Sequence, residues 1–397
     1  MSVRSKAWPW WLQIVGAGVA IWACSGARAP GEPVGAAQAK PASPAPSASS
    51  APAKPPASQG ASTAPEPGLR TMKVPPSAKV NADASEACPS DMQLVSGDYC
   101  SDVEHQCKRS WYDKSNKKTV CEEFEPVSKC VGSKSAKRFC IDRYSWPNVK
   151  GERPEVMNTF HQAEVKCAAV GKRLCTESEW TMACEGPEMK PFPYGYVRDV
   201  NKCNGDHPWD SPNMTKVAKR DPTELARLWR GVPNGSQPEC VSDYGVADLP
   251  GNTDDVVASE TYTKDYKGKF DSVTTGGPWY KGVRNQCRPK IYTHDEGFYY
   301  YYLSFRCCAE SDGQTTDPRT PKQRKANWDF KRVERSARFT VEDVKQKLEL
   351  KKQGQCSCAA HDILCKTLCG TLLGAEAKDV DLKAPRSAAD GSKPSAP

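Results

Sequence analysis

The residues of this chain most able to do chemistry are its 19 cysteines, spread over 397 residues. One of them, Cys287, stands alone in the stretch GGPWYKGVRNQCRPK, and no other cysteine lies between Cys240 and Cys307 in the sequence. An exposed thiolate with a lowered pKa can act as a catalytic nucleophile or hold a soft metal ion. A cysteine without a neighbouring thiol can also be half of a structural disulfide, worth about 2–4 kcal/mol. We favour the disulfide for Cys287 and keep the reactive, catalytic thiol as the alternative.

Four more cysteines gather near the C-terminus, in CSCAAHDILCKTLCG, beside His361. Thiolates and imidazoles are zinc ligands, but this spacing is not a common one for zinc. Two of the four are four residues apart, which places them on one helix face. We therefore predict two local disulfides that close a helical hairpin, with a zinc site as the alternative. The four disulfide candidates are Cys356, Cys358, Cys365 and Cys369.

The N-terminus indicates export. Arg4 and Lys6 precede an apolar run over residues 7–23 that a proline and a glutamine interrupt. Residues 1–23 therefore predict a signal peptide rather than a permanent membrane span. An exported chain folds in an oxidising compartment, where disulfides form.

The sequence IWAC, which ends at Cys24, resembles a bacterial lipobox. It predicts lipidation at Cys24 and a membrane-anchored lipoprotein in the periplasm, at the outer membrane or at the cell surface. The alternative is ordinary cleavage after Ala29. Removing Cys24 from the 19 cysteines leaves 18, an even number that nine disulfides would use completely.

Two segments have the composition of disordered chain. Between Pro30 and Leu69 there are 10 Pro, 11 Ala and 6 Ser, which bury too little to offset the entropy of ordering. We predict a disordered linker over residues 24–87, acting as a tether, and a disordered tail over residues 375–397. The net charge of +8 is mild, and we expect no nucleic-acid partner.

Residues 88–310 have the pattern of a globular domain. Thr159 with Gln162, and Thr176 with Glu179, form two capping boxes, which predict helices that end at glycines. We also predict loops over 201–238 and a cysteine-stapled insertion over 100–140. The predicted strands are 92–95, 139–146, 272–280 and 297–308, the last including the aromatic run Phe298 to Tyr302.

Residues 318–374 form a basic, cysteine-containing segment. Eight Lys or Arg lie between Arg319 and Arg338, and Thr340 caps a helix that Gly354 ends. Such a run is usually a solvated helix face. A surface for an anionic membrane is the sharper interpretation, and an oligosaccharide or nucleic acid the weaker ones.

Seven stretches then occur in a characteristic order. GKRLCTESEW, from Gly171 to Trp180, resembles the GKRLPTEAEWE segment of the formylglycine-generating enzyme, or sulfatase-modifying-factor, domain. The others are FCIDRYSWPN, FPYGY, NKCNGD, YGVADLPGNTDDV, TTGGPWYKGVR and LSFRCCAE. The resemblance covers about 88–310 and suggests a bacterial, exported member of the family. It implies an α+β fold related to C-type lectins, with little regular secondary structure, to which this chain adds many disulfides and a C-terminal helical segment.

The resemblance also implies a chemistry. The oxidising members of the family bind Cu(I) with two cysteines five apart and convert a substrate cysteine to formylglycine with O₂. In this sequence the two thiol positions are Lys281 and Gln286, Cys287 comes one residue late, and Pro278 replaces the serine after the glycine pair. Because one thiol cannot build a two-thiolate site, we do not expect copper.

A second implied metal is calcium, which the family's GNVWE turn helps to hold. In GNTDD the matching residues are Asn252 and Asp255, both hard oxygen ligands, with Asp254 beside them. The alternative is an Asx turn in a polar loop.

Three functions follow from these observations. We favour a non-catalytic binding domain on a lipoprotein tether, whose partner is a protein, glycan or envelope component. Its binding surface is predicted near Trp279, Arg284 and Arg288, where aromatic and guanidinium groups come together in the sequence. The first alternative is a copper-dependent formylglycine-generating oxidase acting on exported sulfatases. The second is a cell-envelope structural protein that acts through its C-terminal basic hairpin.

Overall fold

The computed structural model describes residues 84–114, 117–280 and 283–382. The chain divides into two units, residues 1–71 and 72–397, and all described residues belong to the second. The predicted signal peptide, the lipidation site Cys24 and residues 24–83 of the predicted linker lie outside the described residues, as do Lys281 and residues 383–397. In the part that is described, no helix combines the length and apolar character that crossing a membrane requires.

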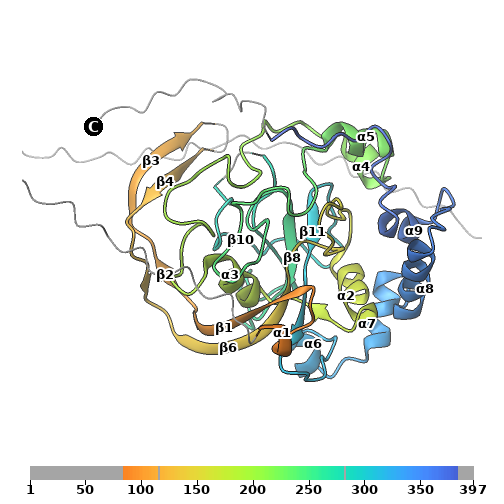
Figure 1. Ribbon diagram of the computed structural model, residues 1–397, viewed down its shortest axis with the longest axis horizontal. Helices are drawn as coiled ribbons and strands as arrows, with labels where there is room; N and C mark the ends of the chain where they lie inside the picture. The colour runs from red at the N-terminus through yellow and green to blue at the C-terminus, as the bar shows by residue number, and fades with distance from the viewer. Residues whose placement is uncertain (1–83, 115–116, 281–282, 383–397) are drawn as a thin grey trace, which may run out of the picture. The chain divides into compact units, whose positions relative to one another are not determined.

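Helices and strands are short and follow one another in mixed order (Figure 1). The helices are α1 (Ala84–Ala87), α2 (Phe160–Ala169), α3 (Glu177–Glu185), α4 (Met214–Ala218), α5 (Pro222–Leu228), α6 (Pro321–Lys325), α7 (Phe330–Ala337), α8 (Val341–Lys352) and α9 (Ile363–Leu368). The strands are β1 (Met92–Cys100), β2 (Val103–Glu104), β3 (Cys107–Asp113), β4 (Lys118–Phe124), β5 (Lys129–Cys130), β6 (Lys134–Asp142), β7 (Arg173–Leu174), β8 (Asp254–Ala258), β9 (Ser272–Thr275), β10 (Lys290–Ile291), β11 (Leu303–Phe305) and β12 (Cys307–Glu310). The prediction of an α+β, disulfide-rich fold with little regular secondary structure is confirmed.

Two four-stranded sheets form the frame. The first has the order β1-β6-β12-β7, and all its pairs are antiparallel. The second has the order β10-β9-β8-β11, in which β11 runs parallel to β8. Because β11 and β12 are separated only by Arg306, the chain passes directly from one sheet to the other. The Arg306 side chain is fully buried there and donates to Asp255 and to the backbone carbonyls of Arg143 and Ala247.

The two predicted capping boxes form as the sequence indicates. Thr159 accepts from the backbone of Gln162 at the start of α2, and Thr176 accepts from Glu179 at the start of α3. Both pairs also make the reciprocal side-chain bond to the cap backbone. The helix predicted after Thr340 is α8. These elements were predictable because their signals are local.

Nine disulfides use all 18 cysteines of the described residues. They are Cys88–Cys140, Cys100–Cys130, Cys107–Cys121, Cys167–Cys307, Cys175–Cys308, Cys184–Cys287, Cys203–Cys240, Cys356–Cys369 and Cys358–Cys365. Such a number is typical of a domain that folds after export.

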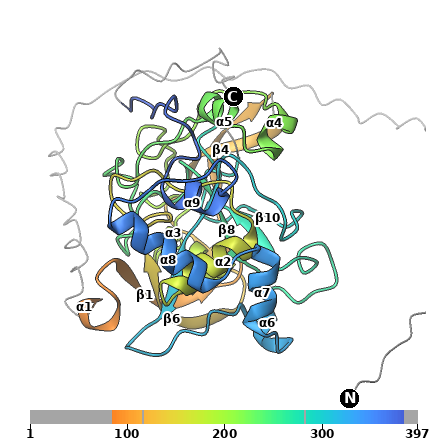
Figure 2. The ribbon, with the colours of Figure 1, turned by 90° about the vertical axis from the view of Figure 1, so that its right-hand side faces the viewer.

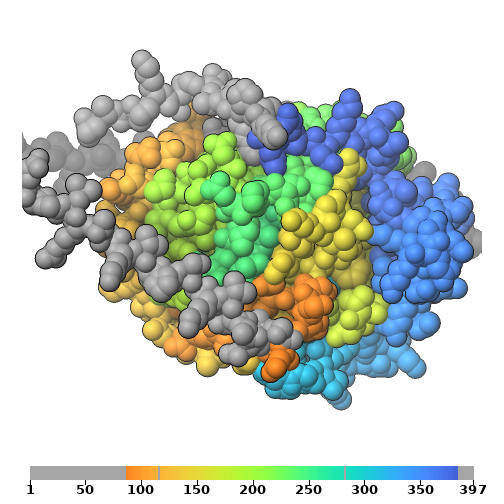
Figure 3. Space-filling model, viewed as in Figure 1, coloured from red at the N-terminus to blue at the C-terminus, as the bar shows by residue number. Residues whose placement is uncertain are grey.

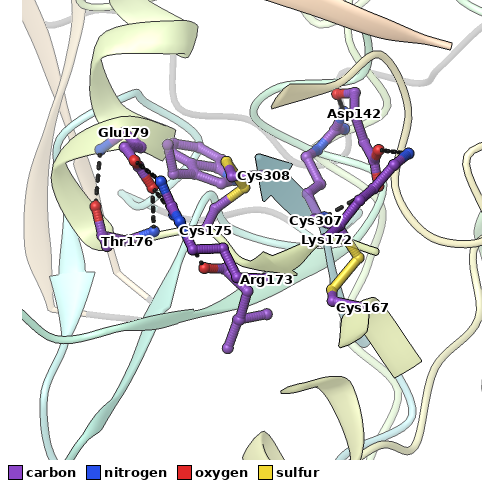
Figure 4. The surroundings of a disulfide bond; sticks show 12 residues. Asp142, Cys167, Lys172, Arg173, Cys175, Thr176, Glu179, Cys307 and Cys308 are labelled. Carbon is purple, nitrogen blue, oxygen red and sulfur yellow. Dashed lines mark hydrogen bonds and ion pairs between the residues drawn. A yellow bond between two sulfur atoms is a disulfide. The ribbon is translucent and has the colours of Figure 1, made fainter. Parts of the chain in front are cut away.

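The adjacent residues Cys307 and Cys308 bridge to opposite sides of β12 (Figure 4). Successive side chains of a strand point to opposite faces, so one sulfur reaches Cys167 on α2 and the other reaches Cys175, just before α3. The segment between those two cysteines also carries Lys172, which is paired with the buried Asp142 at 2.7 Å. Both capped helices are thereby fixed to the same strand.

The C-terminal segment packs into the domain. Helices α2, α7 and α8 lie side by side (Figure 2), and the blue C-terminal segment lies directly against the yellow part of the domain in the space-filling view (Figure 3). Val333, Val344 and Leu368 are buried in the same core cluster as Phe160 of α2. Residues 375–382, predicted as disordered tail, are also ordered: Ala377 is buried and Asp379 is paired with Arg153 at 2.7 Å.

Other predictions of local structure were wrong. The aromatic run Phe298 to Tyr302 is a loop, and strand structure begins only at Leu303. Its tyrosines pack on Trp279 and on one another, so tertiary packing overrides their strand propensity. The predicted loops of 201–238 contain α4 and α5, and the last four residues of the predicted linker form α1.

Candidate functional site

The segment that follows β9 holds the positions expected for a copper site, and it is built as a structural loop. Gly277 has a φ of +74°, and a Cβ there would meet the backbone of Arg284 at 2.8 Å. The carbonyl of Pro278 accepts a hydrogen bond from the Asn285 side chain at 2.9 Å. The Gln286 side chain turns back toward its own loop, donating to the carbonyl of Val283 at 3.5 Å. The loop therefore folds onto itself.

Cys287 ends this loop inside the core. It is completely buried and forms a disulfide with Cys184 of α3, 103 residues away in sequence. Its backbone N–H donates to the carbonyl of Pro191 at 2.9 Å. The alternative of a reactive, catalytic thiol at Cys287 is therefore wrong for this structure, because the sulfur is neither free nor exposed. Without a thiolate here, the described residues do not fit Cu(I), and we derive no step through copper.

The oxygen atoms expected to bind calcium are already used by protein groups. The side-chain oxygen of Asn252 accepts from Asn204 at 3.1 Å and from the backbone of Val232 at 2.9 Å, while its amide donates back to the Val232 carbonyl. Asn252 has a φ of 59° and fastens two loops together. Because its side-chain oxygen already accepts two hydrogen bonds, Asn252 holds loops together and is not placed as a metal ligand.

The two carboxylates beside it face cations. Both oxygens of Asp254 accept from Arg284, at 2.9 and 2.8 Å. One oxygen of Asp255 accepts from Trp180 at 2.9 Å and from Arg306 at 3.0 Å. Burial raises the pKa of both carboxyls, and the paired guanidinium groups oppose that shift. Calcium takes six to eight oxygen ligands, so the single remaining oxygen of Asp255, whose carboxylate is paired with Arg306, does not fit this ion.

The binding surface predicted from Trp279, Arg284 and Arg288 does not form. Trp279 is 2% exposed and packs edge-on against Trp229, with ring centroids 5.0 Å apart. Arg284 is paired with Asp254, whereas Arg288 makes two bonds of 2.7 Å to Glu185. Neighbours in an irregular loop point in different directions, and here each guanidinium finds a different buried carboxylate. Proximity in sequence was therefore a poor guide to a shared surface.

The structure instead brings Tyr280, Tyr302, Arg284 and Asp254 together, and we name these four residues the Tyr280 cluster. The Tyr280 hydroxyl lies 3.4 Å from the Tyr302 hydroxyl. Arg284 donates a hydrogen bond to the Tyr280 hydroxyl at 3.5 Å. Tyr280 and Arg284 are half-buried, whereas Asp254 is fully buried. Burial raises the pKa of Tyr302, so its phenol stays neutral and can donate a hydrogen bond. The cluster thus offers aromatic faces, hydroxyl groups and a fixed cation, but no nucleophile.

Nearby residues extend this cluster toward solvent. The backbone of His207 pairs with Tyr280, and two residues later the Trp209 side chain is 56% exposed. Sequence analysis missed Tyr280, Tyr302 and Trp209. The signal was the unusual density of aromatic residues in 298–302, which was assigned to a strand.

A pocket also lies between residues 147–156 and the C-terminal segment 367–373. Its polar wall includes Glu155 and Arg153. Glu155 is bonded to the buried Lys166, and Arg153 to Asp379. Both charged side chains are therefore already paired within the protein, as Arg284 and Asp254 are in the Tyr280 cluster.

The four C-terminal cysteines pair as Cys356–Cys369 and Cys358–Cys365. The sulfurs of Cys358, Cys365 and Cys369 lie within 4.8 Å of one another. That proximity follows from the two adjacent disulfides. Sulfur atoms in disulfides are not thiolates, which are the form that binds zinc, so the zinc alternative does not fit this structure.

Comparison with known proteins identifies the family. Residues 104–311, just over half of the chain, match the sulfatase-modifying factor enzyme 1-like domain, and the chain belongs to this family. No curated protein sequence matches it.

Three solved structures are similar to the chain. PvdO from Pseudomonas aeruginosa has 15% sequence identity and a TM-score of 0.36, with 55% of this chain and 94% of that chain covered. CarF has 13% identity and a TM-score of 0.38, with coverages of 56% and 98%. Treponema denticola variable protein 1 has 12% identity and a TM-score of 0.32, with coverages of 55% and 94%.

Proposed function

We propose that this protein is a non-catalytic binding member of the sulfatase-modifying-factor family, exported and held on a lipoprotein tether. The observation that carries the proposal is the buried Cys184–Cys287 disulfide, which leaves no free thiol on the one cysteine between Cys240 and Cys307 in the sequence. The replacement of the expected serine by Pro278 and of the second expected cysteine by Gln286 supports the same conclusion.

The Tyr280 cluster is the proposed ligand site. Its two phenols can donate and accept hydrogen bonds, and the Arg284 guanidinium can donate them, beside aromatic faces. This combination suits a hydroxyl-rich or amide-rich ligand. A glycan or an extended peptide of the cell envelope has these groups. The exposed Trp209 interacts with Tyr301, whose ring packs on Tyr302, and so adds an apolar face beside the site.

The experiment that tests the absence of catalysis is an oxygen-uptake assay. The full-length protein is incubated with Cu(I), reductant and a CxPxR peptide, beside a competent formylglycine-generating enzyme. We expect O₂ consumption equal to that of a no-protein control and no formylglycine by mass spectrometry. Formylglycine formed by this protein would establish the oxidase alternative and refute the proposal.

Export and lipidation are part of the proposal and have their own test. Wild-type chain and a Cys24→Ser variant are expressed in a bacterial host fed with a labelled fatty acid. The proposal predicts label in the wild-type protein alone and release of the variant from the membrane fraction. Equal labelling of the two proteins, or none in either, would remove the tether from the account.

A further inference from the structure

The C-terminal helices carry a concentration of unpaired positive charge. Six cations on α6, α7 and the residue after α7 are exposed, and none forms an ion pair with another described residue. We call them the basic face: Arg324, Lys325, Lys331, Arg332, Arg335 and Arg338. The other basic residues of the same segment, Arg319 and Lys322, are paired with Asp317 and Asp271. The unpaired charges are therefore a distinct subset.

The geometry of α7 arranges part of this charge in a row. Lys331, Arg335 and Arg338 follow at intervals of four and three residues, so they lie on one side of the helix. At a rise of about 1.5 Å per residue, the row is about 10 Å long. Helix α6 is separated from α7 by residues 326–329, lies near it in Figure 2, and carries Arg324 and Lys325.

A second segment, residues 261–270, enlarges the basic face with aromatic side chains. The Lys325 ammonium lies 4.1 Å from the ring centroid of Tyr262, and Lys322 donates to the carbonyls of Gly268 and Phe270 at 3.1 and 2.7 Å. These contacts hold the segment against α6. Tyr262 and Tyr266 are 50% and 59% exposed. The same segment carries three further exposed lysines: Lys264, Lys267 and Lys269.

Acidic groups within the basic face are already engaged. Asp329 caps α7 by accepting from the backbone of Lys331 at 3.1 Å, and Glu334 accepts from the backbone of Val341 at 2.9 Å. Asp265 accepts from Thr263 at 2.6 Å. None of the three forms a direct ion pair with a cation of the basic face among the described residues. Their charges lower the net charge of the surface, but the cations remain more numerous.

We propose that the basic face, together with residues 261–270, binds the headgroups of an anionic phospholipid bilayer and orients the domain on it. An extended row of separate cations matches a plane of negative charges better than it matches one small anion. Exposed tyrosines beside it are the side chains that favour the level of the headgroups in a membrane interface. This surface is separate from the Tyr280 cluster, so the two proposals stand independently.

The test uses the full-length chain and vesicles of phosphatidylcholine alone or with 30% phosphatidylglycerol. The variant Arg324→Gln, Lys331→Gln, Arg335→Gln removes three unpaired charges and keeps residues that favour helix. The matched control Lys118→Gln, Lys134→Gln, Lys219→Gln removes three exposed cations from β4, β6 and the end of α4. Any vesicle binding by the N-terminal apolar segment is common to all three proteins and is measured on phosphatidylcholine.

We expect wild type to favour the anionic vesicles. Each cation near such a surface changes binding about fivefold, so the triple variant should lose at least about tenfold of that preference. The control should keep it within about twofold, and raising the salt from low to 0.5 M should weaken wild-type binding because the charges are screened. Circular dichroism and thermal unfolding verify that both variants are folded.

Three results would overturn the proposal: equal binding of wild type to the two kinds of vesicle, equal losses in the variant and the control, or salt-insensitive binding. A fourth separates the membrane from a polysaccharide. If the variant loses retention on heparin but keeps its vesicle preference, the face binds anionic polymers and the membrane proposal is wrong. If the variant does not fold, the salt dependence of wild-type vesicle binding decides.

Discussion

The disulfide between Cys184 and Cys287 joins the last turn of α3 to the end of an irregular loop 103 residues further along the chain. Both residues are fully buried in a core cluster that also holds Trp180 and Val257. The disulfide uses the sulfur of Cys287, the one cysteine in the sequence between Cys240 and Cys307. The end of this loop is therefore fixed to α3 by a buried covalent bond.

Loss of this disulfide should weaken the fold substantially. The double variant Cys184→Ala, Cys287→Ala should lose about 2–5 kcal/mol of unfolding free energy, measured by guanidinium titration. The matched control is Cys107→Ala, Cys121→Ala, which removes a bond across the surface ribbon β3-β4 and should cost less. Equal stability of wild type and the core variant would show that the bond is not structural.

The buried pair of Arg173 and Glu179 gives a pH-dependent prediction. Burial opposes ionisation of Glu179, but the two short bonds to Arg173 outweigh it and lower the pKa of the carboxyl below its ordinary 4.5. Its stabilising contribution is thus fully present above pH 4.5 and is lost as the pH falls through the lowered value. Glu179→Gln should cost about 3–5 kcal/mol at pH 7.

Thermal unfolding of wild type and Glu179→Gln between pH 7 and pH 3 checks this sign. The difference in Tm should shrink as the pH falls, because wild-type Glu179 becomes neutral like the variant. A difference that stays constant or grows with acid would refute the assigned cause.

The C-terminal segment should unfold together with the rest of the described domain. Leu368 of α9 is 3% exposed in the main core cluster, and the neighbouring Thr367 accepts from the buried Lys166 at 3.0 Å. Leu368→Ala should cost about 2–5 kcal/mol and shift the whole transition. Lys345→Ala, at an exposed position of α8, is the control. Two separate transitions, with only one shifted, would show an independent hairpin.

Deletion of the whole C-terminal segment is a poor test of the basic face. Deleting residues 319–374 would remove Val333, Ala337 and Val344 from the core as well as the cations. Loss of envelope association after such a deletion would then report unfolding. Point substitutions at exposed cations avoid this confusion.

Calcium should have no effect on stability. Asn252 and Asp254 are fully engaged by protein donors, and Asp255 keeps only one free oxygen. A bound ion at about a hundred times its Kd would add about 2.7 kcal/mol. Thermal unfolding in excess calcium and in EDTA should therefore coincide. A higher Tm in calcium that Asn252→Ala abolishes would contradict this.

The Tyr280 cluster predicts a selective loss of ligand binding. Tyr280→Phe removes one half-buried hydroxyl and keeps the ring, so a glycan or peptide found by screening should bind about tenfold more weakly. Tyr299→Phe is the matched control, because its hydroxyl donates to the carbonyl of Ala218 away from the cluster. Equal affinities for the two variants would move the binding site elsewhere.

The parts of this fold that sequence predicts well are those with local causes. The capping boxes at Thr159, Thr176 and Thr340 each lie within four residues, and all three start helices. Two family motifs also coincide with short elements: GKRLCTESEW contains β7 and the start of α3, and LSFRCCAE contains β11 and β12.

The parts that failed depend on distant neighbours. Nothing within the sequence near Cys287 indicates Cys184, and nothing near Arg288 indicates Glu185. The run from Phe298 to Tyr302 has strand propensity, but it forms a loop in which Tyr301 and Tyr302 pack on Trp279. Side-chain direction in irregular loops is set by such contacts, which sequence spacing does not reveal.

The most direct test of the central claim is a count of free thiols with a non-reducing disulfide map of the mature protein. The account predicts no thiol that reacts in the folded or denatured protein, and a linked peptide pair containing Cys184 and Cys287. Rapid alkylation of Cys287 in the native protein at neutral pH would contradict it and return the loop to consideration as an active site.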